Sequence, residues 1–227
     1  MDAPHDTAAA GIDAALWDLR GKAAGRRVAD LLAAGRRQPP PRVRLYASGG
    51  VDYDWQHRPE SVIDEALAYA AQGFTAFKMR IGTEWSWAAV TPERFIRLAE
   101  GVTRAVGDRM ELMLDGNQRL DEAQALQIAR ALDALGWTWF EEPIPQADVD
   151  GYARLNASAG IPITGGEQWR TQEQFRPYLE KKAYRIEGGL EVPVATLTGT
   201  ARATLPFEAA GGSKELPSMV VPGYAPG

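Results

Sequence analysis

Residues 138–145, TWFEEPIP, place two adjacent acidic residues directly after an aromatic run and before a proline. The segment 137–141, WTWFE, is a short apolar run, which predicts a buried β-strand. Pro143 is expected to end this strand, because proline cannot donate a backbone hydrogen bond to a ladder. Two carboxylates at the end of a buried strand either lie at a solvated rim or face a cation, and the surrounding sequence helps to decide between these alternatives.

Strand-like and helix-like segments alternate on both sides of this stretch. The predicted strands are 43–48, 74–81, 110–115, 137–141, 161–167 and 183–187. The predicted helices are 7–32, 60–72, 91–106, 120–136, 149–158 and 171–181. The strands are continuous apolar runs in strand–helix units of about 25–35 residues, which is typical of a parallel sheet covered by helices. We therefore expect an α/β fold with about six parallel strands, where eight would close a barrel.

Local composition divides the chain into three parts. Residues 1–41 are expected to form a helix and a linker, because the three prolines at 39–41 cannot continue a helix. Residues 42–187 contain the six predicted strands. Glycine and proline account for 12 of the 41 residues from 187 to 227 (7 Gly and 5 Pro), so residues 188–227 are expected to be irregular.

The composition is that of an ordinary globular protein, with 45% hydrophobic residues, 24% charged residues and a net charge of −5. The negative charge and the lack of a basic stripe argue against a nucleic-acid partner. The chain contains no cysteine, which excludes disulfides and fits a reducing compartment. No apolar run approaches the ~20 residues of a membrane span, and the first residues do not resemble a signal peptide. We expect a cytoplasmic protein without a membrane or nucleic-acid partner.

Three acidic residues end three successive predicted strands. Asp115, Glu141 and Glu167 are 26 residues apart, since 141 − 115 and 167 − 141 both equal 26. In a parallel sheet the carboxyl ends of the strands share one edge, where active sites are built. One such acid is more often a solvated loop residue, but three converging carboxylates would repel one another unless a cation neutralised them. Oxygen ligands, no cysteine and no suitable histidine favour Mg²⁺ or Mn²⁺ over zinc.

Two cationic residues lie close to the end of the second predicted strand. Lys78 and Arg80 are two residues apart, so both side chains point to the same face. One interpretation is that both side chains reach into the same pocket as the acids, where they bind a substrate carboxylate or transfer a proton, with a neighbouring cation depressing the pKa of the lysine. The other is that they form salt bridges with acids at the rim. Asn117 and Gln118 follow Asp115 and are further candidates for substrate contact, although Asn-Gln after glycine is also ordinary turn chemistry.

Six motifs together resemble the enolase superfamily, specifically the mandelate racemase / muconate lactonizing enzyme family and its acid-sugar dehydratases. The resemblance covers about residues 8–186. The motifs are GIDAALWDLRGKAAGRRVADLL (11–32), VRLYASGG (43–50), GFTAFKMRIG (73–82), MLDGNQ (113–118), WFEEPIP (139–145) and PITGGEQW (162–169).

The resemblance implies a modified TIM barrel that follows an α+β capping domain. It implies that Asp115, Glu141 and Glu167 hold an essential Mg²⁺, which binds the carboxylate of a small-molecule substrate and stabilises the enediolate formed when a base removes the α-proton. The family's K-x-K motif falls on Lys78-Met79-Arg80, so that its second lysine, often a base, is Arg80 here. A guanidinium stays protonated, and Arg80 is therefore expected to orient or neutralise the substrate. This favours dehydration of a sugar acid over a two-base racemase or epimerase. The full-length family also implies a homo-oligomer.

The sequence departs from the family pattern at both ends. Few residues precede the first motif, and the Gly/Pro-rich segment after Glu187 contains no histidine, the residue that family members commonly use as a second base or as an acid. We expect a partial barrel that lacks the capping domain and the last strands, with a non-native tail. An alternative to the enzyme is therefore a metal-binding remnant without turnover.

Overall fold

The computed structural model of the chain describes residues 3–33, 45–51, 55–81, 85, 89–169 and 172–184, with only the backbone for residues 3–7 and 172. The helices are α1 (Ala3–Ala24), α2 (Val28–Leu32), α3 (Ser61–Ala71), α4 (Pro92–Val106), α5 (Glu122–Ala134), α6 (Val149–Ser158) and α7 (Gln172–Glu180). The strands are β1 (Ala47–Gly49), β2 (Ala76–Arg80), β3 (Glu111–Asp115), β4 (Trp139–Glu141) and β5 (Ile163–Thr164).

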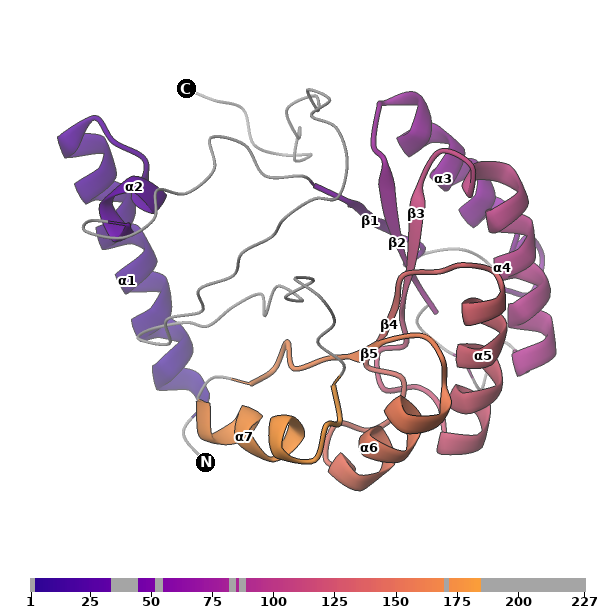
Figure 1. Cartoon of the computed structure of the whole chain (residues 1–227). Helices are drawn as coiled ribbons and strands as arrows, with labels where there is room; N and C mark the ends of the chain where they lie inside the picture. The colour runs from indigo at the N-terminus through magenta and orange to yellow at the C-terminus, as the bar shows by residue number, and fades with distance from the viewer. Residues whose placement is uncertain are drawn as a thin grey trace.

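The five strands form one sheet in the order β1-β2-β3-β4-β5, and every neighbouring pair is parallel. Each strand is followed by a helix along the chain, from α3 after β1 to α7 after β5. Figure 1 shows helices α3, α4, α5 and α6 along one side of the curved sheet. The predicted α/β fold with a parallel sheet is therefore confirmed.

The main hydrophobic core lies between the sheet and these helices. Side chains alternate between the two faces of a strand, so every second strand residue enters this core. The fully buried strand residues on this side are Phe77, Met79, Leu114, Phe140 and Ile163. They pack with buried helix residues such as Phe95 and Ile128. The continuous apolar runs of the sequence therefore correspond to strands whose helix-facing side is completely covered.

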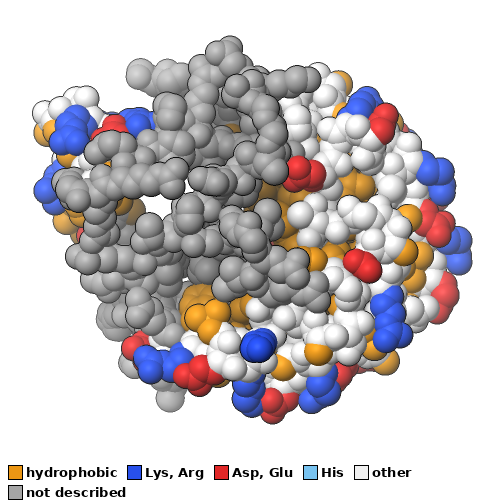
Figure 2. Space-filling view, in the orientation of Figure 1, with side chains coloured by type: hydrophobic (Ala, Val, Ile, Leu, Met, Phe, Trp, Pro, Cys, Tyr) orange, Lys and Arg blue, Asp and Glu red, His pale blue; other side chains and the backbone are white. Residues whose placement is uncertain are grey.

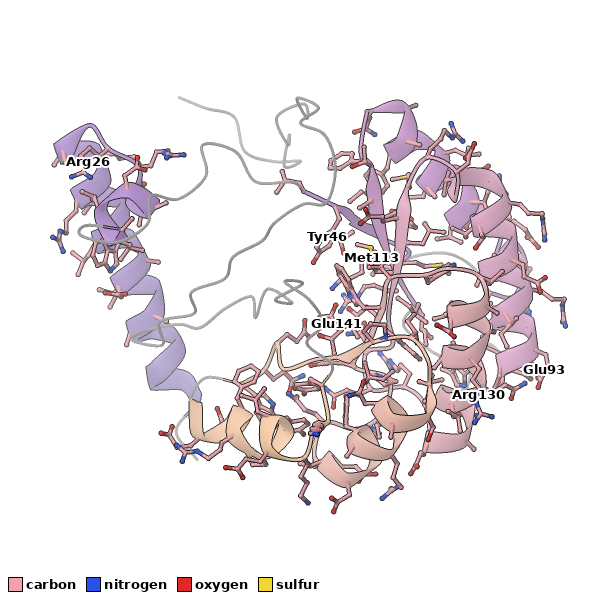
Figure 3. All side chains as sticks on the ribbon, in the orientation of Figure 1. Arg26, Tyr46, Glu93, Met113, Arg130 and Glu141 are labelled. Atoms are coloured by element: carbon pink, nitrogen blue, oxygen red, sulfur yellow. The ribbon has the colours of Figure 1, made fainter. Side chains whose placement is uncertain are left out.

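The other side of the sheet is apolar at its amino end and charged at its carboxyl end. Ala76, Met113 and Trp139 form a second buried cluster here, against which Tyr46 packs. The rings of Tyr46 and Trp139 meet edge to face, with centroids 6.1 Å apart. Figure 3 shows Tyr46, Met113 and Glu141 on the side of the sheet that faces away from α4 and α5. This side of the sheet therefore carries both an apolar cluster and the strand-end acid Glu141.

The sequence also determines where two of the covering helices begin. Thr91 caps α4, because its hydroxyl oxygen accepts a hydrogen bond from the backbone N–H of Arg94 at 3.3 Å, and Pro92 follows at the first helical position. Asp121 and Gln124 form a reciprocal capping box at the start of α5. These caps set the starting points of the helices that follow β2 and β3.

Charged side chains lie mainly over the helices. Arg154 of α6 binds Glu122 of α5 at 2.7 Å, and Lys181 binds Asp150 at 2.5 Å. Figure 2 shows Lys, Arg, Asp and Glu side chains along the rim formed by the helices, with hydrophobic side chains toward the middle of the view. Within the described ranges, no helix combines the length and the apolar character that a membrane crossing requires.

Strands β1 and β4 begin later than predicted, at Ala47 and Trp139, and three other elements differ more from the sequence-based prediction. The predicted helix 7–32 is divided, because the chain turns at Gly25, which has a φ of +60°, and resumes as α2. The predicted strand 161–167 is reduced to β5, since Gly166 adopts a φ of +102° two residues after its end. The predicted sixth strand is not seen at Ala183 and Tyr184, and its residues 185–187 lie outside the described residues, as do 188–227.

Candidate functional site

The carboxyl ends of β2, β3 and β4 bring four charged side chains to one edge of the sheet. In the parallel register, Arg80 is the partner of Asp115, and Asp115 is the partner of Glu141. Lys78 precedes Arg80 by two residues, so it lies on the same side of β2. The register therefore brings two of the three predicted metal ligands side by side, with both predicted cations next to them.

Lys78 links the two carboxylates. Its Nζ lies 2.5 Å from Glu141 Oε2 and 3.6 Å from Asp115 Oδ2. Arg80 Nε donates to the same Asp115 Oδ2 at 3.2 Å. Lys78 is only 8% exposed and Asp115 only 2%. The cations thus form salt bridges with the strand-end acids, as one of the two interpretations of the sequence predicted, but these bridges are largely removed from solvent.

The pKa values of this group reflect the balance of burial and charge. Burial by itself would lower the pKa of Lys78, but the adjacent carboxylates of Glu141 and Asp115 outweigh it and raise the pKa above its ordinary value. The expectation of a depressed lysine pKa is therefore wrong for this arrangement, because the charged neighbours that determine the shift are anions. Burial raises the pKa of Glu141, and Asp115 and Glu167 add to the effect although Lys78 opposes it. Burial is therefore the main reason that the charged form of Glu141 is disfavoured, and Lys78 only partly offsets it.

The third predicted ligand, Glu167, does not join the pair. It is exposed, and it follows the turn at Gly165-Gly166 that ends β5. Among the described residues, no three Asp, Glu or His side chains lie close enough together to hold a metal ion. The chemistry of the donor set still fits a hard cation such as Mg²⁺, because the buried Asp115 and the half-buried Glu141 offer carboxylate oxygens at one edge.

Asn117 and Gln118 support the acids through their own loop. The backbone N–H of Asn117 donates to Asp115 Oδ1 at 2.9 Å, which orients this carboxylate. The side-chain amide of Gln118 donates to Glu142 Oε2 at 3.1 Å. Both residues have positive φ values, 45° and 61°, which are uncommon outside glycine. The structure therefore gives Asn117 a backbone contact to a candidate ligand and leaves its predicted contact with substrate as an expectation.

Glu142 is the residue of this region whose importance the sequence interpretation missed. The sequence suggests only that its side chain points away from Glu141 and serves the loop. It is 1% exposed, and its Oε1 accepts a hydrogen bond from the backbone N–H of Gly166 at 3.3 Å. Burial raises the pKa of Glu142, while the hydrogen bond from Gln118 acts in the opposite direction. An acid directly after a strand end and before proline was the only sequence signal, and it does not distinguish a buried carboxylate from a solvated one.

Gly116 allows the loops after β3 and β4 to lie against each other. Its backbone N–H donates to the carbonyl oxygen of Glu141 at 2.7 Å. A Cβ atom at Gly116 would lie 2.9 Å from both the carbonyl oxygen of Glu142 and the Cα of Pro143. Both are backbone atoms that cannot move aside independently, so the close approach requires glycine.

We expect Gly116→Ala to lower the free energy of unfolding by about 1–3 kcal/mol, because it forces the two loops apart. Gly101→Ala is a suitable comparison, since the nearest atom to its new Cβ would be the flexible Cδ1 of Ile63 at 3.0 Å. Urea unfolding followed by circular dichroism measures both. Equal losses in the two variants would contradict the assignment of the strain to the loop contact.

Comparison with known proteins places this geometry in a family. The family profile described as "Enolase C-terminal domain-like" matches residues 61–199, which include β2 to β5. The profile "Mandelate racemase / muconate lactonizing enzyme, N-terminal domain" matches residues 3–33, which include α1 and α2. The chain belongs to the mandelate racemase / muconate lactonizing enzyme family of the enolase superfamily. The resemblance of its sequence motifs to this family is thereby confirmed.

The curated relatives of this family member include sugar-acid enzymes. The chain is 36% identical over 163 residues to D-galactarolactone cycloisomerase from Agrobacterium fabrum, a match that covers 72% of this chain and 40% of the relative. It is 33% identical over 176 residues to arabinonate dehydratase from Saccharolobus solfataricus, covering 78% of this chain and 44% of the relative. The chain thus spans less than half the length of these relatives.

Solved structures of the family share the fold. The 3,6-anhydro-D-galactonate cycloisomerase from Zobellia galactanivorans matches with a TM-score of 0.67 and 32% identity, over 79% of this chain and 46% of that chain. A racemase from Streptomyces coelicolor with bound magnesium matches with a TM-score of 0.65 and 29% identity, over 78% of this chain and 49% of that chain. Magnesium is therefore present in at least one solved structure to which this chain is similar.

Proposed function

We propose that the chain belongs to an enzyme that removes the proton next to the carboxylate of a sugar acid in a Mg²⁺-dependent reaction and thereby dehydrates its substrate. The observation that best supports this function is the pair of carboxylates of the buried Asp115 and the half-buried Glu141, in register at the carboxyl edge of a parallel sheet with Lys78 and Arg80 on the same face. Relatives named arabinonate dehydratase, D-galactonate dehydratase and L-talarate/galactarate dehydratase support the substrate class.

Asp115, Glu141 and Glu167 would hold the Mg²⁺, and Mn²⁺ has the same preference for oxygen ligands. When bound, the ion supplies a Lewis acid that stabilises the negative charge which develops as the α-proton leaves. A bound cation would oppose the effect of burial and of the neighbouring carboxylates, which together raise the pKa of Glu141 despite Lys78. The exposed Glu167 follows a glycine pair, and it is the member of the set with the most freedom to approach the other two.

Lys78 and Arg80 have different roles in this proposal. Arg80 stays protonated, and its planar guanidinium suits it to orient a substrate carboxylate. Lys78 holds its proton at Nζ while it donates to Glu141 at 2.5 Å. Loss of this contact would remove the interaction that raises its pKa, so Lys78 is the residue of the pair that can exchange a proton with the substrate. Asn117 is assigned to substrate contact from its position beside Asp115.

The second candidate function is isomerisation of a related acid. It is favoured by the names of two relatives, D-galactarolactone cycloisomerase and 3,6-anhydro-D-galactonate cycloisomerase. Its first step would use the same acids and the same cation pair, so the two functions differ only in the steps after proton removal. The two outcomes can be separated by their products.

The test is a screen of the purified chain against a panel of sugar acids with Mg²⁺ in D₂O, followed by proton NMR and an assay for 2-keto acids. Dehydration predicts formation of a 2-keto acid. Isomerisation predicts no 2-keto acid, but deuterium at the α-carbon of the substrate or a rearranged product. Binding of Mg²⁺ without either signal would support the metal-binding remnant instead. Turnover that persists after chelation of the metal would contradict the proposal.

A further inference from the structure

We propose that Glu142 is a positioning residue that ties the segments after β3, β4 and β5 together and thereby sets the relative positions of Asp115, Glu141 and Glu167. This inference rests on the metal site proposed above. Glu142 is not among the proposed ligands, because both of its carboxylate oxygens accept hydrogen bonds from Gln118 and Gly166.

Glu142 contacts both neighbouring segments through its side chain and its backbone. Toward the loop after β3, its Oε2 accepts from Gln118 Nε2 at 3.1 Å and its carbonyl oxygen accepts from the backbone N–H of Gln118 at 2.7 Å. Toward β5, its Oε1 accepts from the backbone N–H of Gly166 at 3.3 Å and its own N–H donates to the carbonyl oxygen of Thr164 at 2.9 Å. One residue therefore joins the three segments that carry the candidate ligands.

The burial of Glu142 shows that these hydrogen bonds are required. A carboxylate that is 1% exposed loses nearly all contact with water, which is costly unless hydrogen bonds replace it. Space around the side chain is also limited, since a Cβ atom at Gly165 would lie 3.1 Å from Glu142 Cγ. The side chain thus has little freedom to change its partners.

The backbone of the same loops is held in uncommon conformations. Asn117, Gln118 and Glu142 have φ values of 45°, 61° and 40°, in the left-handed region that residues other than glycine seldom occupy. Such conformations persist only where the surrounding contacts stabilise them. The hydrogen bonds between Gln118 and Glu142 are the contacts that join two of these strained positions directly.

Donors and acceptors in this unit are matched. Three acceptor oxygens, Glu142 Oε1, Glu142 Oε2 and Gln118 Oε1, receive three donors, the N–H of Gly166, the amide of Gln118 and the N–H of Gln146, the last at 3.0 Å. In Glu142→Gln, both residue 118 and residue 142 carry a side-chain amide. Their two oxygens must accept from the backbone N–H groups of Gly166 and Gln146, so their two NH₂ groups, which are both donors, face each other. In Gln118→Glu, two carboxylates face each other. The exchanged double variant, Glu142→Gln with Gln118→Glu, restores every pairing and preserves the net charge.

The experiment measures Mg²⁺ affinity by titration calorimetry, and hydrogen exchange of the Gly166 and Gln146 amides by NMR, in the two single variants, the double variant and the unaltered chain. We expect each single variant to bind Mg²⁺ about 10- to 100-fold more weakly and the double variant to recover most of that loss. We expect exchange protection of the two amides, measured without metal, to fall in the single variants and to return in the double variant.

The Gln118→Glu variant separates geometry from charge. It adds a negative charge near the site, so a purely electrostatic influence would tighten Mg²⁺ binding, and that result would overturn the inference. Normal Mg²⁺ affinity in both single variants would also overturn it while leaving the proposed function intact.

If the unaltered chain fails to bind Mg²⁺, the proposed metal site fails. Amide exchange then decides the positioning role. Unchanged protection of the Gly166 and Gln146 amides in the single variants would overturn it. Loss of protection in the single variants with recovery in the double variant would support it. Circular dichroism of all four proteins identifies any variant that does not fold, and recovery in the double variant remains the decisive comparison.

Discussion

Glu141→Gln is expected to weaken Mg²⁺ binding by at least about 100-fold and to remove detectable turnover of any sugar acid that the unaltered protein dehydrates. The substitution keeps the shape of the side chain but removes the negative charge next to Asp115. It also leaves Lys78, whose Nζ is 2.5 Å from Glu141 Oε2, with a neutral partner in place of a carboxylate. Titration calorimetry with Mg²⁺ and the 2-keto acid assay measure the two effects.

Glu180→Gln provides the control for this prediction, because Glu180 is exposed at the end of α7 and lies on a different element from Asp115 and Glu141. It changes the net charge by the same amount and should leave Mg²⁺ affinity unaltered. Comparable Mg²⁺ affinity in the Glu141 and Glu180 variants would remove Glu141 from the proposed site.

Lys78→Met is expected to lower the free energy of unfolding by about 3–5 kcal/mol, because it leaves the largely desolvated Glu141 without its charged partner. Asp115 would keep Arg80, whose Nε lies 3.2 Å from its Oδ2, but would lose the second cation at 3.6 Å. Methionine fills a volume similar to that of the lysine stem, so the loss reports mainly on charge. Denaturant unfolding at pH 7 measures it.

Lys181→Met is a closely matched control for Lys78→Met. Lys181 also lies 2.5 Å from a carboxylate, that of Asp150, but both side chains are about half exposed or more, at 49% and 66%. Water screens this pair, so its removal should change stability by no more than the error of the measurement. A similar loss in both variants would show that burial does not strengthen the dependence on Lys78.

The contribution of Lys78 to stability should also depend on pH in a defined direction. Its pKa in the folded protein is raised above the ordinary 10.5, so the unfolded chain releases this proton first as the pH rises. The stabilisation is therefore fully present below pH 10.5 and is lost as the pH passes through the higher folded-state value. The difference in unfolding free energy between the unaltered protein and Lys78→Met should accordingly shrink in strongly alkaline solution. A difference that grows there would contradict this sign.

The sequence was most informative where chemistry repeats along the chain. The equal spacing of the acids and the apolar strands before them predicted that Asp115 and Glu141 would meet at one edge of a parallel sheet, and the register brings them side by side. The alternation of side chains placed Lys78 and Arg80 on the same face, and the structure joins both to Asp115. Spacing was less informative for Glu167, because β5 ends at Thr164 and Gly166 adopts a φ of +102°, so Glu167 does not continue the strand.

By itself, then, the sequence determined the order of strands and helices, the family, and which charged residues reach the carboxyl edge of the sheet, because these arise from local patterns of period two and from strand–helix repeats. Only the tertiary structure decided that Lys78 binds Glu141 and that Glu142 is a buried residue joined to Gln118 and Gly166. The physical reason is that these contacts form between segments 24 to 63 residues apart. Their geometry depends on how neighbouring strands pair and on loop conformations that the strands hold in place.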